Sequence, residues 1–120
     1  MCLVSVNPNT FVNSENIICY KVLKEDMTSP YRDYKYSEIT VAEGEPYVNP
    51  FQNLYIVETG FLHSYKNIES AKVLVYETLR KSHFKCKIFK CEIPAGTPYY
   101  VGLRDDLCST QLKILEEYHD

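Results

Sequence analysis

Residues 67–93 read NIESAKVLVYETLRKSHFKCKIFKCEI and decide the fold, because a helical pattern is followed directly by a strand pattern. Apolar side chains recur at the spacing of one helix face: Ile68, Ala71, Val75 and Leu79. Asn67 is a favoured N-cap residue, and Arg80 and Lys81 suit the negative end of the helix dipole. We therefore predict one principal helix over about residues 67–81.

The strand pattern in residues 84–93 changes phase. Cys86 and Ile88 alternate with lysines, and then Phe89 and Cys91 continue the apolar series in the opposite phase. Such a change within one strand predicts either a β-bulge or burial of both faces of the strand.

Further strands are expected on both sides of this unit. The β-branched and aromatic segments are residues 16–23, 36–41, 54–58, 99–101 and 110–116. Residues 42–50 contain one Gly and two Pro, and we expect a loop there. Short connections favour antiparallel pairing. The predicted fold is α+β: a mainly antiparallel sheet of about five to six strands, with the one principal helix packed on one face.

The composition fits a single domain over residues 1–120. With 45% hydrophobic and 24% charged residues, the chain can bury a core. Its net charge of −3 argues against a uniformly cationic domain. The sequence has no run of about 20 apolar residues and no secretory signal pattern. We expect a cytoplasmic protein of a bacterial host cell, with no membrane partner.

The cysteines indicate a reducing compartment. They form an odd set without a Cys-x-x-C pair: Cys2, Cys19, Cys86, Cys91 and Cys108. A structural zinc site normally needs close pairs of ligands, and a disulfide framework needs an even number of cysteines. We therefore predict free, buried thiols, no metal and no cofactor.

Eleven tyrosines against no tryptophan point to a contact surface. The densest run combines rings and cations: Tyr31, Arg32, Tyr34, Lys35 and Tyr36. These residues are candidates to anchor a protein partner or to stack on bases. The alternative is a loop whose rings fold back onto the edge of the sheet.

Positive charge is concentrated in one part of the chain. Residues 64–90 carry seven cations and two carboxylates, whereas the rest of the chain has six cations and fourteen carboxylates. The candidate partner-binding cations are Arg80, Lys81, Lys85, Lys87 and Lys90. They would meet phosphates or the acidic surface of a partner. A solvated strand face beside helix-capping cations explains the same residues.

A third candidate site is a small-ligand pocket near a glycine-led turn. Its residues are Phe61, His63, Tyr65, Tyr99 and Tyr100. A histidine beside a helix N-terminus can contact a ligand or transfer a proton. No metal-site or nucleophile motif accompanies His63, and a histidine that bonds within its own turn is the alternative.

The turn before the helix and a later Cys-x-Ile-Pro-x-Gly-Thr-x-Tyr-Tyr segment, residues 91–100, resemble parts of small uncharacterised proteins. Those proteins occur in phages and mobile elements of Bacteroidetes-type bacteria. The turn is carried by Gly60, Phe61, His63, Ser64 and Tyr65, with Leu62 inserted relative to those proteins. The resemblance covers about the C-terminal half of the chain and implies a phage context. It implies no established activity. Small acidic phage proteins often block host defences, so the phage context leads us to expect a role like that of anti-CRISPR proteins.

The same segments also resemble ADP-ribosyltransferase-like domains, which carry a similar turn before a helix and a strand end followed by a catalytic glutamate. That resemblance implies contact of His63 and Tyr65 with a nicotinamide dinucleotide. It implies Glu116 or Glu117 as the catalytic acid.

The function predicted from these observations is non-enzymatic binding. We expect a phage-encoded inhibitor of a bacterial defence system that contacts a nuclease effector or its guide RNA. The alternatives are an ADP-ribosyltransferase-like enzyme and a small-nucleotide-binding module. The sequence leaves the oligomeric state open.

Overall fold

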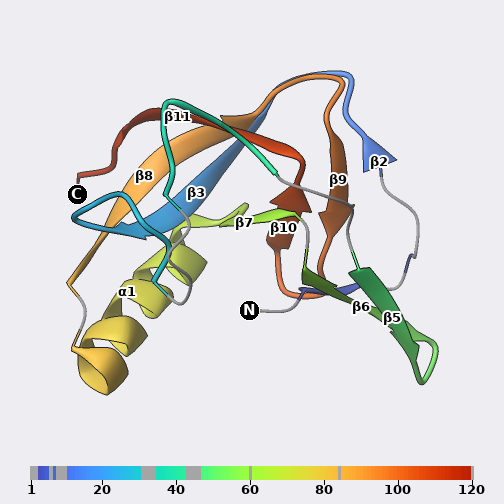
Figure 1. The fold of residues 1–120 in the computed structure, drawn as a ribbon, viewed down its shortest axis with the longest axis horizontal. Helices are drawn as coiled ribbons and strands as arrows, with labels where there is room; N and C mark the ends of the chain where they lie inside the picture. Colours follow the sequence, from blue (N-terminus) through green and yellow to red (C-terminus); the bar gives the residue numbers. More distant parts are fainter. Residues whose placement is uncertain are drawn as a thin grey trace.

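The fold is described from a computed structural model of the chain, for residues 3–5, 7, 11–30, 35–42, 47–59, 61–83 and 85–119. This part of the chain forms one helix and eleven strands (Figure 1). In chain order they are β1 (Leu3–Ser5), β2 (Phe11–Val12), β3 (Ile17–Lys24), β4 (Ile39–Val41), β5 (Tyr47–Phe51), β6 (Leu54–Thr59), β7 (Leu62–Tyr65), α1 (Ile68–Ser82), β8 (Cys86–Ile93), β9 (Pro98–Val101), β10 (Asp106–Ser109) and β11 (Gln111–Glu117).

The strands form two antiparallel sheets. The larger sheet has the order β2-β9-β10-β7-β3-β8-β11-β4, and the smaller has the order β1-β6-β5. The predicted fold, one sheet of five to six strands with a helix alone covering one face, is therefore wrong. The described chain is mostly β, with eleven strands in two sheets, and the smaller sheet shares that face with the helix. The strands that the sequence did not show, β1, β2, β5, β7 and β10, have only two to five residues each. Alternation cannot be recognised over so few positions.

Strands β3 and β8 form the centre of the larger sheet. Their register runs without interruption from Ile17 opposite Ile93 to Lys24 opposite Cys86. The phase change predicted in β8 reflects burial on both of its faces, and its partner β11 carries the irregularity, between Ile114 and Glu116.

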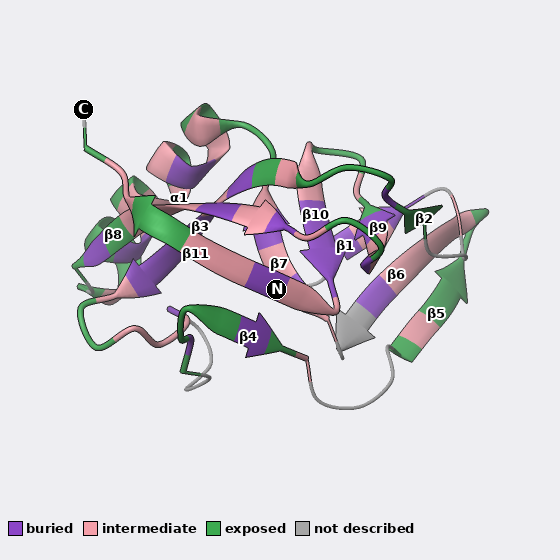
Figure 2. Ribbon diagram, turned by 90° about the horizontal axis from the view of Figure 1, so that it is seen from above, coloured by how far each residue is buried: buried purple, intermediate pink, exposed green. Residues whose placement is uncertain are grey.

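One face of the larger sheet, which we call the inner face, encloses the largest core cluster. The buried members are Cys19, Leu23, Tyr36, Leu62, Cys91, Ile93, Leu107 and Leu112. They come from β3, β7, β8, β10 and β11 and from the segment before β4, so the sheet curls around this cluster. Figure 2 shows buried residues along β10 and mostly exposed ones along β4 and β5.

The opposite face, which we call the helix face, is covered in two places. Helix α1 packs on β3, β7 and β8, where Val22, Ala71 and Cys86 are buried. The smaller sheet packs near β9 and β10, where Leu3 and Val57 meet Tyr100 and Cys108. Figure 1 shows α1 and the β5–β6 hairpin on the same side of the larger sheet, toward opposite ends.

Helix α1 confirms the prediction made from residues 67–81. Asn67 is the N-cap, and its side chain accepts a hydrogen bond from the backbone N–H of Glu69 at 3.2 Å. The helix ends at His83, a left-handed C-cap residue.

The prediction of a loop over residues 42–50 is wrong for residues 47–50, because these residues belong to β5 (Tyr47–Phe51). Gln52 and Asn53 both have positive φ angles, of 47° and 64°, and connect β5 to β6 as a two-residue turn. Such turns match the twist of a hairpin. Pro50 is tolerated because β5 is the edge strand of its sheet.

Candidate binding groove

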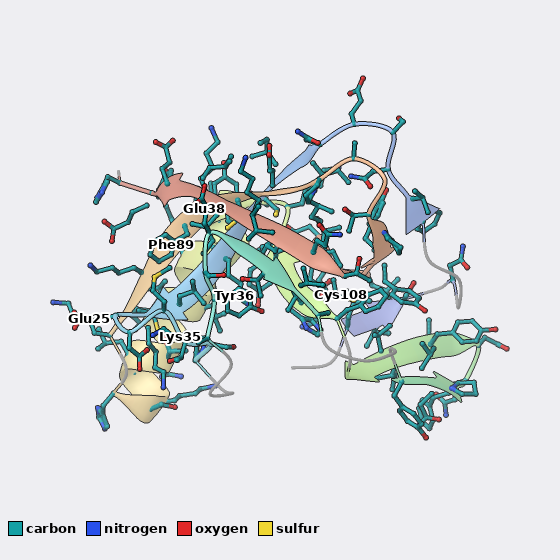
Figure 3. All side chains as sticks on the ribbon, turned by 45° about the horizontal axis from the view of Figure 1, so that its top comes forward. Glu25, Lys35, Tyr36, Glu38, Phe89 and Cys108 are labelled. Atoms are coloured by element: carbon teal, nitrogen blue, oxygen red, sulfur yellow. The ribbon has the colours of Figure 1, made fainter. Side chains whose placement is uncertain are left out.

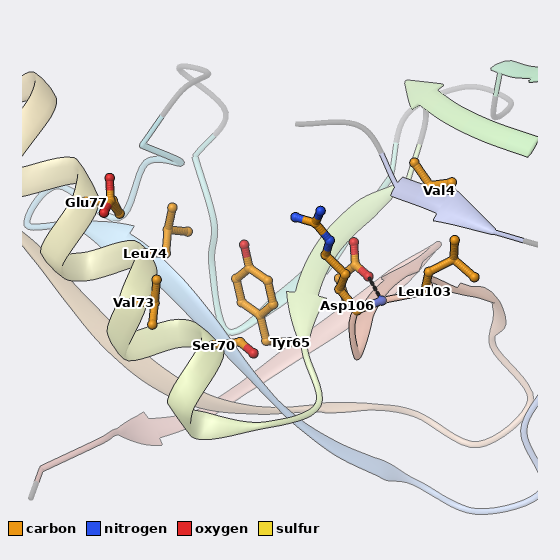
Figure 4. Close-up of a pocket in the computed structure, with 9 residues that line it drawn as sticks. Val4, Tyr65, Ser70, Val73, Leu74, Glu77, Leu103 and Asp106 are labelled. Atoms are coloured by element: carbon orange, nitrogen blue, oxygen red, sulfur yellow. Dashed lines mark hydrogen bonds between the residues drawn. The ribbon is translucent and has the colours of Figure 1, made fainter.

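A groove of about 660 Å³ lies on the helix face, between α1 and the smaller sheet. It is lined by Val4, Tyr65, Ser70, Val73, Leu74, Glu77, Leu103, Arg104 and Asp106. Figure 4 shows the side chains of α1 along one side, Val4 and Leu103 along the other, and Tyr65 between them. Its volume and mostly apolar walls are typical of sites that bind organic ligands.

Asp105, in the turn between β9 and β10, fixes the helix wall of the groove. Its carboxylate accepts hydrogen bonds from the backbone N–H of Asn67 at 3.1 Å and from the hydroxyl of Ser70 at 2.9 Å. Its backbone oxygen also accepts the N–H of Lys66 at 2.9 Å. A carboxylate at this position satisfies the free N–H of the N-cap residue and lies at the positive end of the helix dipole.

The other wall is fixed by the same turn. Gly102 donates its N–H to the backbone oxygen of Asp106 at 2.8 Å, and a Cβ at position 102 would overlap the carboxylate of Asp106. The next residue, Leu103, donates its N–H to the oxygen of Val4 at 2.9 Å. The turn therefore joins both walls, and the groove is built on paired strands and one helix.

The three charged side chains of the groove differ in their partners. Glu77 lies 3.1 Å from Nζ of Lys81 and 3.7 Å from Arg80, and the hydrogen bond from Lys81 holds the pKa of Glu77 below its usual range. Asp106 accepts the backbone N–H of Arg104 at 3.3 Å. The guanidinium of Arg104 forms no ion pair with any residue that the structure describes, and Arg104 is exposed.

The residues predicted for a small-ligand pocket are divided between several places. Phe61 and Tyr100 pack together in the core beneath the smaller sheet, with ring centroids 5.3 Å apart and ring planes tilted by 47°. His63 lies opposite Cys108 on the same side of the larger sheet. Tyr99 lies beside Phe11, with ring centroids 5.9 Å apart, and packs against the inner-face cluster. Of the five predicted residues, only Tyr65 lines the groove.

The tyrosine run is only partly described. Tyr31, Arg32 and Tyr34 lie outside the described residues. Lys35 is exposed, whereas Tyr36 is buried in the inner-face cluster (Figure 3). The two described members of the run are therefore not on one surface.

Three of the five candidate cations face a carboxylate. Arg80 and Lys81 flank Glu77, and Nζ of Lys87 lies 3.3 Å from Glu117. Lys85 is exposed and Lys90 is half-buried on β8. Arg80, Lys81 and Lys85 lie close together along the chain, where α1 ends and before β8 begins.

The two groups required by the enzyme alternative lie on different strands. His63 belongs to β7, and Glu116 and Glu117 belong to β11. Strands β3 and β8 lie between β7 and β11 in the sheet. Glu117 is paired with Lys87 and lies 3.1 Å from Nε2 of His119.

The described cysteines are free and buried, as predicted: Cys19, Cys86, Cys91 and Cys108. Burial raises the pKa of Cys19 to about 11 and those of Cys91 and Cys108 to about 12. These thiols stay protonated near neutral pH, which makes them poor nucleophiles. Cys2 lies outside the described residues.

Lys21 is a buried cation that the sequence analysis did not single out. It lies on the inner face, 7% exposed, with its Nζ 4.8 Å from the ring centroid of Tyr36. Burial lowers the pKa of Lys21 to about 8, against a smaller opposing effect of Cys91 and Cys19. Its signal in the sequence is its phase, because Lys21 lies two residues from both Cys19 and Leu23 on β3 and therefore shares their buried face.

The groove itself was also missed from the sequence. The segment containing Leu103 and Arg104 reads as a polar turn, and no local pattern places it against a helix that precedes it or against β1. These residues meet only in the tertiary structure, through the pairing of β10 with β7, the hydrogen bond from Leu103 to Val4 and the bonds from the start of α1 to Asp105.

Comparisons with known proteins give no relative: no protein-family model, no curated protein and no solved structure matches this chain. In the part of the chain that the structure describes, no helix has the length and apolar character needed to span a membrane.

Proposed function

We propose that this protein is a non-enzymatic binding protein that docks the exposed side of α1 onto a partner protein. The observation that carries the proposal is an apolar stripe on that side. Val73, Tyr76 and Leu79 are 61%, 63% and 52% exposed. They recur every three residues on the only helix in the described part of the chain.

The stripe is not needed to hold the helix on the sheet. The opposite side of α1 already packs through Ala71 and Thr78, which are fully buried. Adjacent exposed apolar residues on one element mark an interaction site more often than scattered ones do.

Charge identifies the kind of partner. Arg80 and Lys81 occupy the last turn of α1, and exposed Lys85 follows the helix. The pairing of Arg80 and Lys81 with Glu77 is exposed, and such pairs exchange partners at little cost in free energy. The fitting partner therefore presents an apolar surface bordered by carboxylates.

A protein partner suits this surface better than RNA does. Three large apolar side chains lie in the centre, and the cations lie at one end. Recognition of RNA relies instead on phosphate contacts, spread along a basic surface, and on stacking. A nuclease effector of a bacterial defence system, in the bacterial cytoplasm, stays the predicted target, and its guide RNA becomes an outcome of the test.

The test is capture of partners by matched variants of the tagged protein from a bacterial lysate, with and without ribonuclease. Tyr76→Gln and Leu79→Gln each remove one apolar side chain of the stripe, and glutamine has a high helix propensity. Ile39→Gln is the control, because Ile39 is 56% exposed on the edge strand β4. A captured protein counts only if it also binds the purified wild-type chain.

We expect a partner that the wild type and the control retain and both stripe variants lose, with binding that weakens as salt is raised. Retention by Tyr76→Gln and Leu79→Gln at wild-type affinity would overturn the proposal. Loss of the partner after ribonuclease treatment would replace it with an RNA-mediated contact.

A further inference from the structure

We propose that the groove between α1 and the smaller sheet is a separate site for an amphipathic organic anion. The apolar body of this ligand would lie between the walls, and its carboxylate would bind Arg104. This site does not depend on the partner proposed above.

The shape of the groove supports a ligand of drug-like size. About 660 Å³ lies within the range found for small-molecule sites. Val4 and Leu103 line one side, and Val73 and Leu74 line the other, so the body of the ligand meets apolar surface on both sides. Tyr65 and Ser70 add hydroxyl groups to the lining.

The distribution of charge selects an anion. Both carboxylates that line the groove already have donors, because Glu77 is paired with Lys81 and Asp106 accepts a backbone N–H. Among the described residues that line the groove, Arg104 is the one cation, and it forms no ion pair with any of them. A guanidinium binds a carboxylate through two parallel hydrogen bonds.

The walls hold their spacing without a ligand. Asp105 ties the first turn of α1 to the turn that carries Leu103 and Arg104, and Leu103 is hydrogen-bonded to Val4. A preformed site loses less conformational entropy on binding than a site that must be ordered. The geometry therefore favours binding of a free ligand by the isolated protein.

The groove and the docking stripe are separable. Val73 borders both surfaces, but Tyr76 and Leu79 do not line the groove, and Arg104 is not part of the helix. Substitution of Arg104 therefore tests the groove alone.

The test uses the fluorescent probe anilinonaphthalene sulfonate, which joins an aromatic body to an anionic group. Its saturable fluorescence increase on the wild-type protein would report occupancy, and decanoate or decanol would then displace it. The two competitors share an alkyl chain and differ in charge. The variants are Arg104→Gln, Arg104→Lys and, as a control for net charge, Lys113→Gln on β11.

We expect Arg104→Gln to weaken displacement by decanoate about tenfold while decanol is unaffected. Arg104→Lys should restore part of the loss, and Lys113→Gln should match the wild type. Far-ultraviolet circular dichroism would verify that each variant is folded. The proposal is overturned if neither the probe nor decanoate binds the wild type, or if Arg104→Gln weakens decanoate and decanol equally.

Discussion

The two faces of the larger sheet differ in which side chains they bury. The inner face buries a lysine, Lys21, beside thiols and a tyrosine ring. The helix face leaves Tyr76 and Leu79 of α1 in solvent. Burial of a charge and exposure of large apolar groups both cost free energy. On the inner face, burial of the surrounding apolar side chains offsets the cost of burying Lys21. No burial offsets the cost of exposing Tyr76 and Leu79 unless a partner covers them. We therefore place the binding function on the helix face.

The largest expected difference between the faces is the cost of removing a leucine. Leu23 is fully buried on the inner face, and Leu23→Ala should lower the free energy of unfolding by about 3 kcal/mol. Leu79→Ala, on the exposed side of α1, should change it by no more than about 0.5 kcal/mol. Urea denaturation of both variants measures the contrast.

An equal cost for the two leucines would contradict this comparison. It would mean that Leu79 is covered in the isolated protein, by a second copy or by part of the chain outside the described residues. The docking proposal would then lose its main observation.

Lys21→Met should stabilise the protein by about 3 kcal/mol at pH 7. Burial lowers the pKa of Lys21 from 10.5 to about 8. Keeping this amine protonated in the folded protein at pH 7 therefore lowers the free energy of unfolding. Between pH 8 and pH 10.5 the unfolded chain keeps this proton more tightly than the folded one. The contribution of Lys21 to the free energy of unfolding therefore becomes more favourable as pH rises through that window.

The buried thiols act in the opposite direction, so the variant must be compared with the wild type at each pH. The raised pKa values of Cys19, Cys91 and Cys108 mean that their contribution to stability is lost above about pH 9. Because both proteins contain these thiols, the difference between them reports Lys21 together with its smaller electrostatic effect on Cys19 and Cys91. The advantage of Lys21→Met should shrink from pH 8 upward, and a constant advantage would show that Lys21 is not buried as a charge.

Gly102→Ala should have the next largest effect, about 2 kcal/mol of destabilisation, because the new Cβ would overlap the carboxylate of Asp106. The displaced turn carries Asp105, so the first turn of α1 should also lose protection from amide hydrogen exchange.

Gly96→Ala is not a matched control, since Gly96 has a φ of 81° that strains any other residue. Val101→Ala, on the same side of the turn, is a better one. A stable Gly102→Ala with unchanged exchange would show that the turn does not anchor the helix.

How much of this the sequence predicts depends on the length and locality of each element. Helix α1 and strands β3 and β8 have 8 to 15 residues, long enough for periodicity and caps to define them. Strand β7, with the sequence LHSY, and β10, with DLCS, are too short and too polar to be distinguished from turns. They acquire their conformation from pairing with each other, and that pairing is a tertiary effect.

The candidate site shows the same limit. The helix that carries Tyr76 and Leu79 is defined by the sequence, but the helical spacing assigned Leu79 to the same face as Ala71 and Val75. In the structure Leu79 is exposed, as Val73 and Tyr76 are, whereas Ala71 is buried. The anion site needs Arg104, Leu103 and Val4 to meet α1, and those residues come from opposite ends of the chain. No local pattern encodes that contact.

The smallest expected effect is that of an exposed lysine, which serves as the matched control for Lys21. Lys81→Met removes the same charge on the helix face, where Nζ of Lys81 lies 3.1 Å from Glu77 in an exposed pair. The pKa of Glu77, held low chiefly by the hydrogen bond from Lys81, should rise toward its ordinary value, as measured by nuclear magnetic resonance titration. The urea midpoint of Lys81→Met at pH 7 should match that of the wild type within experimental error, since water screens the exposed pair.

A stabilisation as large as that of Lys21→Met would mean that replacing any lysine by an apolar residue stabilises this protein. Burial of the charge on the inner face would then not be the cause.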